Sequence, residues 1–164
     1  MRQTTIDVPC VPVLISAPLK AAPQGSKTLG RYGGLREASK RVKPYRDALK
    51  VYAKEAMRGK KPLTGPVAIN VTFCFVQAQS NRDIYPIGRN IGDLDKLCRS
   101  TLDALTGIVY EDDSQVSVLS AQKYYMRKDE VEIQIHRFTD SVREIERGSH
   151  DRPIPTPRSR THCD

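Results

Sequence analysis

Six carboxylates lie close together in the segment between Gly92 and Val116 of an otherwise basic chain. They are Asp93, Asp95, Asp103, Glu111, Asp112 and Asp113. Carboxylate oxygens are the ligands that Mg²⁺ and Mn²⁺ prefer, and these ions keep water molecules that substrate phosphates can replace. An acidic cluster within a basic protein therefore predicts a metal site that faces a polyanion, as a nucleic-acid-cleaving enzyme requires.

Asp93 and Asp95 are two positions apart, and in a regular helix such side chains point about 200° apart. They can face one ion from an extended segment or from the start of a helix, and Gly92 favours such a turn. The helix dipole there favours the ionised carboxylates that metal binding requires. A third carboxylate can come from Asp113, where a strand is predicted to begin. From spacing alone, solvated aspartates in turns remain the alternative.

A short amphipathic helix is predicted over residues 94–105, ending before Gly107. Its apolar residues share one arc of the helical wheel and its charged residues the opposite arc, so it should pack on a sheet with its charged side outward. On that side Asp95, Arg99 and Asp103 are four apart and are predicted to form a ladder of ion pairs.

The elements predicted around this helix are an edge strand, a long basic loop, a second helix and three further strands. In chain order they cover residues 4–15, 16–38, 43–58, 66–77, 114–126 and 130–138. Pro9 and Pro12 indicate that the first strand lies at a sheet edge, because proline cannot donate to a ladder. We predict one domain over residues 1–138 and, from the polar, proline-rich composition, a disordered tail over residues 139–164.

Basic residues outnumber acidic ones by 27 to 19, which gives a net charge of +8 that favours binding to nucleic acid. On the helix predicted over residues 43–58, basic residues recur every four positions, and these like charges repel one another mildly. Such a row suits an anionic partner, although a solvated outer face is the alternative. The predicted DNA-binding residues are Lys27, Arg31, Arg36, Lys40, Arg41, Lys43, Arg46, Lys50, Lys54, Arg58 and Lys96.

The remaining composition argues against several classes of protein. The 4 cysteines form no C-x-x-C pair and the 3 histidines show no zinc spacing, so reduced thiols are predicted. The sequence has no apolar run of about 18 residues, the length that a transmembrane helix needs. The first residues lack the apolar region of a secretory signal, so a cytoplasmic location is expected.

The acidic segment resembles the signature of the RusA-type Holliday-junction resolvases, in which D-L-D-x-L-x-[K/R]-x-x-x-D-A-L-x-G is followed by D-D-x-Q-V. Members of that family are small, dimeric, Mg²⁺-dependent endonucleases of bacteria and many phages. The resemblance implies an α/β (α+β) fold, with a small mixed sheet and two main helices on one side. It further implies Mg²⁺, or Mn²⁺ in its place, as cofactor, four-way DNA junctions as substrate and a homodimer.

Carried over position by position, the resemblance implies that Asp93, Asp95 and Asp113 bind the metal. The family's catalytic lysine falls on Arg99, a departure that matters because arginine stabilises negative charge but does not donate a proton. Arg99 is therefore expected to stabilise the transition state. Lys96 stands where the family often has asparagine, and is expected to supply part of the missing ammonium function.

The leading hypothesis is a Mg²⁺-dependent endonuclease whose symmetric dimer nicks two opposed strands of a symmetric junction. A protein that binds branched DNA without cleaving it is the alternative, because of Arg99. An Asp-x-Asp phosphatase or sugar-nucleotide transferase is disfavoured, since the residue two positions after Asp95 is Leu97 rather than threonine or valine.

Overall fold

The structure is a computed structural model of the 164-residue chain. It describes residues 11–25, 27–29, 35–37, 40–88 and 90–137. The tail predicted over residues 139–164 and the beginning of the predicted first strand lie outside these described residues. Within them, no helix is both long enough and apolar enough to cross a membrane.

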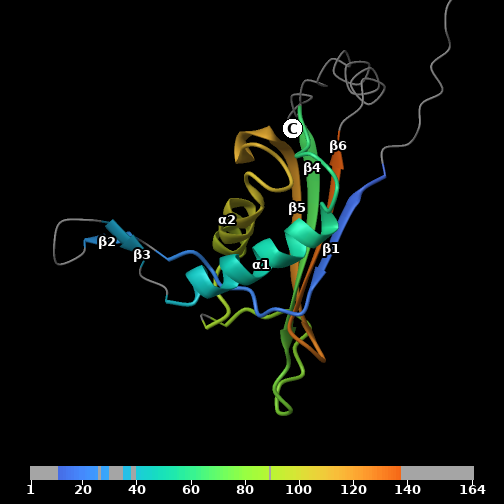
Figure 1. Cartoon of the computed structure of the whole chain (residues 1–164). Coiled ribbons are helices and arrows are strands. Elements are labelled where there is room, and N and C mark those ends of the chain that lie inside the picture. The colour runs from blue at the N-terminus through green and yellow to red at the C-terminus, as the bar shows by residue number, and fades with distance from the viewer. Residues whose placement is uncertain (1–10, 26, 30–34, 38–39, 89, 138–164) are drawn as a thin grey trace, which may run out of the picture.

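Four strands form one mixed sheet in the order β1–β6–β4–β5 (Figure 1). Their bounds are Val13–Ala17 for β1, Val67–Val76 for β4, Val116–Met126 for β5 and Glu130–Arg137 for β6. β4 and β5 are parallel, whereas β6 is antiparallel to both β4 and β1. The edge position that the prolines predicted for the first strand is confirmed by β1, and β5 forms the opposite edge of this sheet.

Two helices, α1 (Val42–Ala56) and α2 (Leu94–Leu105), lie against the same face of the sheet (Figure 1). The alternation of β4 explains that face, since its odd-numbered residues are apolar and buried: Val67, Ile69, Val71, Phe73 and Phe75. α1 covers them with Val42, Tyr45, Leu49 and Ala53, and α2 with Leu97, Cys98, Ala104 and Leu105. The predicted α+β fold, a mixed sheet with both helices on one side, is thus confirmed.

The segment predicted as a basic loop over residues 16–38 contains a short hairpin, so that prediction was wrong in part. β2 (Lys27–Leu29) pairs antiparallel with β3 (Leu35–Glu37). Figure 1 shows these two strands projecting away from the four-stranded sheet. Strands of three residues are too short to show the alternation of apolar and polar residues that identifies a strand in a sequence.

Candidate active site

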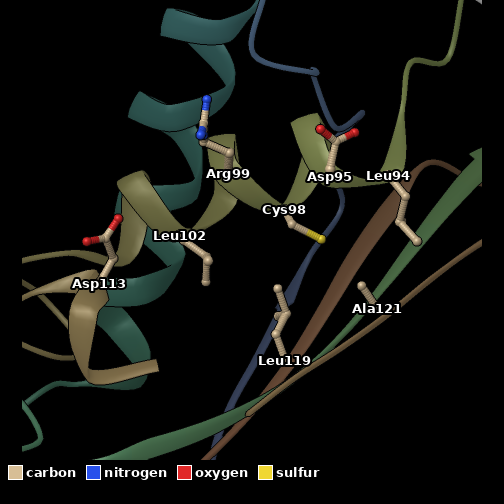
Figure 2. A pocket seen from close by; sticks show the side chains of 8 residues that line it. All are labelled: Leu94, Asp95, Cys98, Arg99, Leu102, Asp113, Leu119 and Ala121. Carbon is tan, nitrogen blue, oxygen red and sulfur yellow. The ribbon is translucent and has the colours of Figure 1, made fainter. Parts of the chain in front are cut away.

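Three of the predicted catalytic residues, Asp95, Arg99 and Asp113, line one open pocket with a volume of about 530 Å³ (Figure 2). α2 forms one wall, and two apolar residues of β5 form another side of the pocket. Its lining residues are Leu94, Asp95, Cys98, Arg99, Leu102, Asp113, Leu119 and Ala121. The pocket therefore lies between the helix that carries the first half of the motif and the strand that follows the second half.

Asp95 and Arg99 lie one helical turn apart on the exposed side of α2, because the opposite side is buried against the sheet through Leu97 and Cys98. Neither Asp95 nor Arg99 forms an ion pair with any residue that the structure describes. Figure 2 shows Asp95 and Asp113 toward opposite ends of the pocket, with Arg99 on the same helix as Asp95. These charges are available to a ligand.

The two adjacent aspartates of the motif have different roles. Asp112 caps the short 3-10 helix η1 (Asp113–Gln115), because its carboxylate accepts a hydrogen bond of 2.9 Å from the backbone N–H of Ser114. The Gln115 side chain completes a capping box by accepting from the backbone N–H of Asp112 at 3.0 Å. The bond from Ser114 lowers the pKa of Asp112. Asp112 thus shapes the turn, whereas Asp113 lines the pocket.

Gln115 also anchors this turn to the rest of the fold. Its Nε2 donates to the carbonyl oxygens of Leu63 and Gly65, each at 2.9 Å. Leu63 and Gly65 precede β4, the strand that pairs with β5. The side-chain hydrogen bonds of Asp112 and Gln115, at the two ends of η1, therefore hold Asp113 in place relative to the sheet.

Asp93 does not line this pocket. It is the N-cap of α2, with the extended backbone angles φ −75° and ψ 145°, and it is exposed. Its carboxylate lies 2.7 Å from Lys96 Nζ. The hydrogen bond from Lys96 holds the pKa of Asp93 below its usual value, with a smaller contribution from the charge of Lys123. Asp93 is thus ionised at neutral pH, and an ion bound there would compete with the Lys96 ammonium group.

Among the described residues, no group of three or more histidine, cysteine, aspartate or glutamate side chains is arranged to hold a metal ion. The three predicted ligands are therefore not gathered into a ready-made cluster, since Asp93 lies apart from the pocket of Asp95 and Asp113. The donor chemistry still suits Mg²⁺, because this ion is usually held by one or two carboxylates, with water and substrate phosphates as its other ligands.

The segment that contains Pro23 and Gln24 covers the beginning of α2. The backbone N–H of Gln24 donates to the carbonyl of Lys96 at 3.0 Å. Gly92 has a φ of +95°, and a Cβ atom there would lie 2.4 Å from Pro23 Cγ. Glycine is needed at this turn both for its backbone angle and for the close approach of Pro23.

Lys123 is a residue near the site that the sequence reasoning missed. It lies on β5 and donates a hydrogen bond of 2.9 Å from Nζ to the carbonyl oxygen of Gly92. A lysine in a half-buried strand is a detectable signal, because a strand facing a helix is otherwise apolar at such positions. The contact with Gly92 itself depends on how α2 crosses the sheet.

The predicted ladder Asp95–Arg99–Asp103 is wrong at both steps, because neither Asp95 nor Arg99 forms an ion pair among the described residues. Asp103 instead forms an ion pair with Arg46 of α1. α1 packs against α2 and brings Arg46 to the side of Asp103, while Arg99 is one of the residues that line the pocket. Arg46 was predicted to bind DNA, but only 23% of its side chain is exposed and its guanidinium group already has a partner.

The other predicted DNA-binding residues differ in how available their charges are. Lys43, Arg58 and Lys96 are paired with Asp47, Glu55 and Asp93 respectively. Arg41 donates to the carbonyl of Asn90 at 3.3 Å. Lys40, Lys50 and Lys54 have no ion pair among the described residues. Lys27 and Arg36 belong to β2 and β3, where only the backbone is described, and Arg31 lies outside the described residues.

Comparison with known proteins agrees with this geometry. Residues 18–136 match the family described as Endodeoxyribonuclease RusA. The matched range contains both helices, both halves of the acidic motif, and all four residues predicted to be catalytic. No curated protein matches the chain.

Proposed function

Because the chain belongs to the RusA family of Holliday-junction-resolving endodeoxyribonucleases, we propose that it resolves four-way DNA junctions by Mg²⁺-dependent nicking. The family accounts for the endonuclease activity and for the class of DNA, and the metal requirement is our proposal. The observation that carries it is the pocket that Asp95, Arg99 and Asp113 all line, each of them without an ion-pair partner among the described residues.

In this proposal Asp95 and Asp113 supply carboxylate oxygens in the pocket, and Asp93 supplies one at the beginning of α2. A bound Mg²⁺ ion would activate water and neutralise charge on the scissile phosphodiester. Metal binding at Asp93 would release the Lys96 ammonium group from its ion pair and leave it free to contact a phosphate. The separation of these carboxylates means that coordination by all three requires them to approach one another when metal and DNA bind.

Arg99 is proposed to bind the phosphate that is cleaved. Its guanidinium group can donate two parallel hydrogen bonds to phosphate oxygens, which compensates negative charge as it develops in the transition state. Arginine keeps its proton throughout, so the leaving oxygen must take a proton from water rather than from this side chain.

The proposed DNA surface includes Lys40, Lys50 and Lys54, whose charges are unpaired among the described residues, together with the β2–β3 hairpin. Each phosphate that these residues neutralise releases counterions, so affinity for DNA should fall steeply with salt. We also propose a homodimer acting in the cytoplasm of a bacterial or phage-infected cell. Two active sites related by a two-fold axis match the symmetry of a four-way junction and would nick two opposed strands.

The test is cleavage of a synthetic four-way junction in Mg²⁺, with linear duplex of the same sequence as control. Asp95→Asn and Asp113→Asn should reduce the nicking rate by at least about 100-fold, as expected for loss of a group that holds the ion. Asp112→Asn is the matched control, because asparagine caps a helix as well as aspartate does. The proposal fails if wild type nicks no branched DNA or if Asp95→Asn nicks as fast as wild type.

A second candidate function is binding of branched DNA without cleavage, and Arg99 is the observation that favours it, since the family has lysine there. This function predicts tight, salt-sensitive binding of a junction with no product in Mg²⁺ or Mn²⁺. In that case Arg99→Lys should restore nicking, whereas an active wild-type enzyme excludes this alternative.

A further inference from the structure

Lys123 connects the edge strand of the sheet to the turn that precedes the site helix. The half-buried side chain of Lys123 extends from β5 and donates its hydrogen bond to the Gly92 carbonyl at 2.9 Å. Gly92 is followed directly by Asp93 and, after one residue, by Asp95. One side chain of the sheet therefore holds the backbone from which two of the proposed metal ligands project.

Other contacts also restrain this turn, since Ile91 is buried in the core and Arg41 donates to the carbonyl of Asn90 at 3.3 Å. The backbone of the turn belongs to no strand, and the first helical hydrogen bond of α2 runs from the Leu97 N–H to the Asp93 carbonyl at 3.1 Å. On one side, Pro23 packs against Gly92, at a distance that leaves no room for a Cβ atom. Lys123 approaches from β5, so the turn is clamped between two segments that are distant in the sequence.

Unlike the exposed lysines of α1, Lys123 uses its ammonium group in a hydrogen bond to a backbone carbonyl. A charged donor bonded to a carbonyl forms a stronger hydrogen bond than a neutral donor does. Its charge also adds to that of Lys96 in favouring the ionised form of Asp93. Lys123 is thus suited to hold the turn rather than to bind a phosphate of DNA.

We propose that Lys123 is a positioning residue that holds the Gly92–Asp93 turn and thereby places the Asp93 and Asp95 carboxylates for a divalent cation. The cation is taken from the proposed function, on which this inference rests. The role is comparable to that of the outer-shell partners that orient metal ligands in other proteins, whose loss weakens metal binding by about 10- to 100-fold.

The first experiment measures binding of Mn²⁺ alone, by electron paramagnetic resonance and without DNA. Lys123→Met keeps the aliphatic stem and removes the donor, so it should weaken Mn²⁺ binding by about 10-fold or more. Lys123→Arg, which keeps the charge and the donor, should recover part of the affinity. Lys128→Met is the matched control, because Lys128 pairs with Glu130 in the β5–β6 turn. Equal Mn²⁺ binding by Lys123→Met and wild type, or no binding by wild type, overturns the inference.

The second experiment measures hydrogen exchange in peptides that cover residues 92–98, without metal or DNA. Lys123→Met should accelerate exchange there by about 10-fold and leave β4 unchanged, since local opening is governed by local contacts. Junction affinity in EDTA should stay the same, and a loss equal to that of Lys54→Met would show a phosphate contact and overturn the inference. If wild type binds Mn²⁺ but nicks no junction, the proposed function fails, whereas these two measurements still decide the role of Lys123.

Discussion

The ion pair between Arg46 and Asp103 offers a direct test of how α1 holds the site helix. It joins α1 to α2 next to a buried hydrogen bond of 2.8 Å between the hydroxyl groups of Tyr45 and Thr101. Arg46→Met removes the guanidinium group, and Asp103→Asn removes the negative charge with little change of shape. We expect both variants to lower the free energy of unfolding, and the double variant to lose less than the sum of the two.

The expected loss in the free energy of unfolding depends on how far the ion pair is buried. The exposed fractions of the two side chains are 23% for Arg46 and 35% for Asp103, so water screens them only in part. Fully exposed pairs contribute about 0.2–1 kcal/mol, and hydrogen bonds to charged groups about 1.5–3 kcal/mol. Each single variant should therefore lose about 1–2 kcal/mol, with a coupling energy of about 1 kcal/mol. For a domain of this size that loss lowers Tm by roughly 2–8 °C.

Chemical unfolding of wild type, the two single variants and the double variant gives the coupling energy. Junction binding without metal measures whether Arg46 contributes to the affinity for DNA. If Arg46 were instead a phosphate contact, Arg46→Met would weaken binding and reduce the salt slope by about 1, whereas Asp103→Asn would strengthen binding. Lys54→Met is the control, because Lys54 is exposed and should affect binding alone. A coupling energy of zero, or a binding loss for Arg46→Met that equals that of Lys54→Met, would refute the reasoning.

Two further predictions concern the turn before α2 and the pocket thiol. Gly92→Ala should lower the free energy of unfolding by roughly 2–5 kcal/mol, from about 1–2 kcal/mol of backbone strain and about 1–3 kcal/mol of overpacking against Pro23. Gly65→Ala, measured in the same urea titration, should lose only the contribution of backbone strain, since Gly65 has a φ of +78° and no atom lies within 4 Å of a Cβ atom placed there. Equal losses of stability for the two variants would contradict the role of Pro23. Burial raises the pKa of Cys98 from 9.0 to about 11, so its contribution to stability is present below pH 9 and is lost as pH rises toward 11. Alkylation of Cys98 at pH 8, followed by mass spectrometry, should be at least about tenfold slower in the native than in the unfolded chain, and equal rates would refute the shift.

Several features of the site could be predicted because they depend on neighbours in the chain. The bounds of α2 agree with the predicted 94–105, since amphipathic periodicity and the glycines on either side are local signals. The separate role of Asp112 is also local, because a capping box needs only Gln115 three positions later. The meeting of Asp95 with Arg99 on one helical face follows from a spacing of four.

The charge partners of the basic residues on α1 could be predicted only within the helix. Spacing alone places Lys43 beside Asp47, four positions on, and this ion pair is present at 2.6 Å. The same spacing favoured Arg99 as the partner of Asp103, although Arg46 of the other helix takes that place. An amphipathic pattern shows which face of a helix is polar, but does not show which polar face of another helix lies beside it.

The sequence by itself determined the fold class, the helix and strand that carry the acidic motif, and the identity of its carboxylates, because these depend on periodicity and on residue type. Tertiary structure alone decided that Arg46 belongs to Asp103, that Lys123 holds Gly92, and that Asp93 lies outside the pocket lined by Asp95 and Asp113. The first two of these contacts join residues 57 and 31 positions apart. Such contacts arise only when α1, α2 and β5 have packed, since the crossing of elements sets which side chains come within hydrogen-bonding distance.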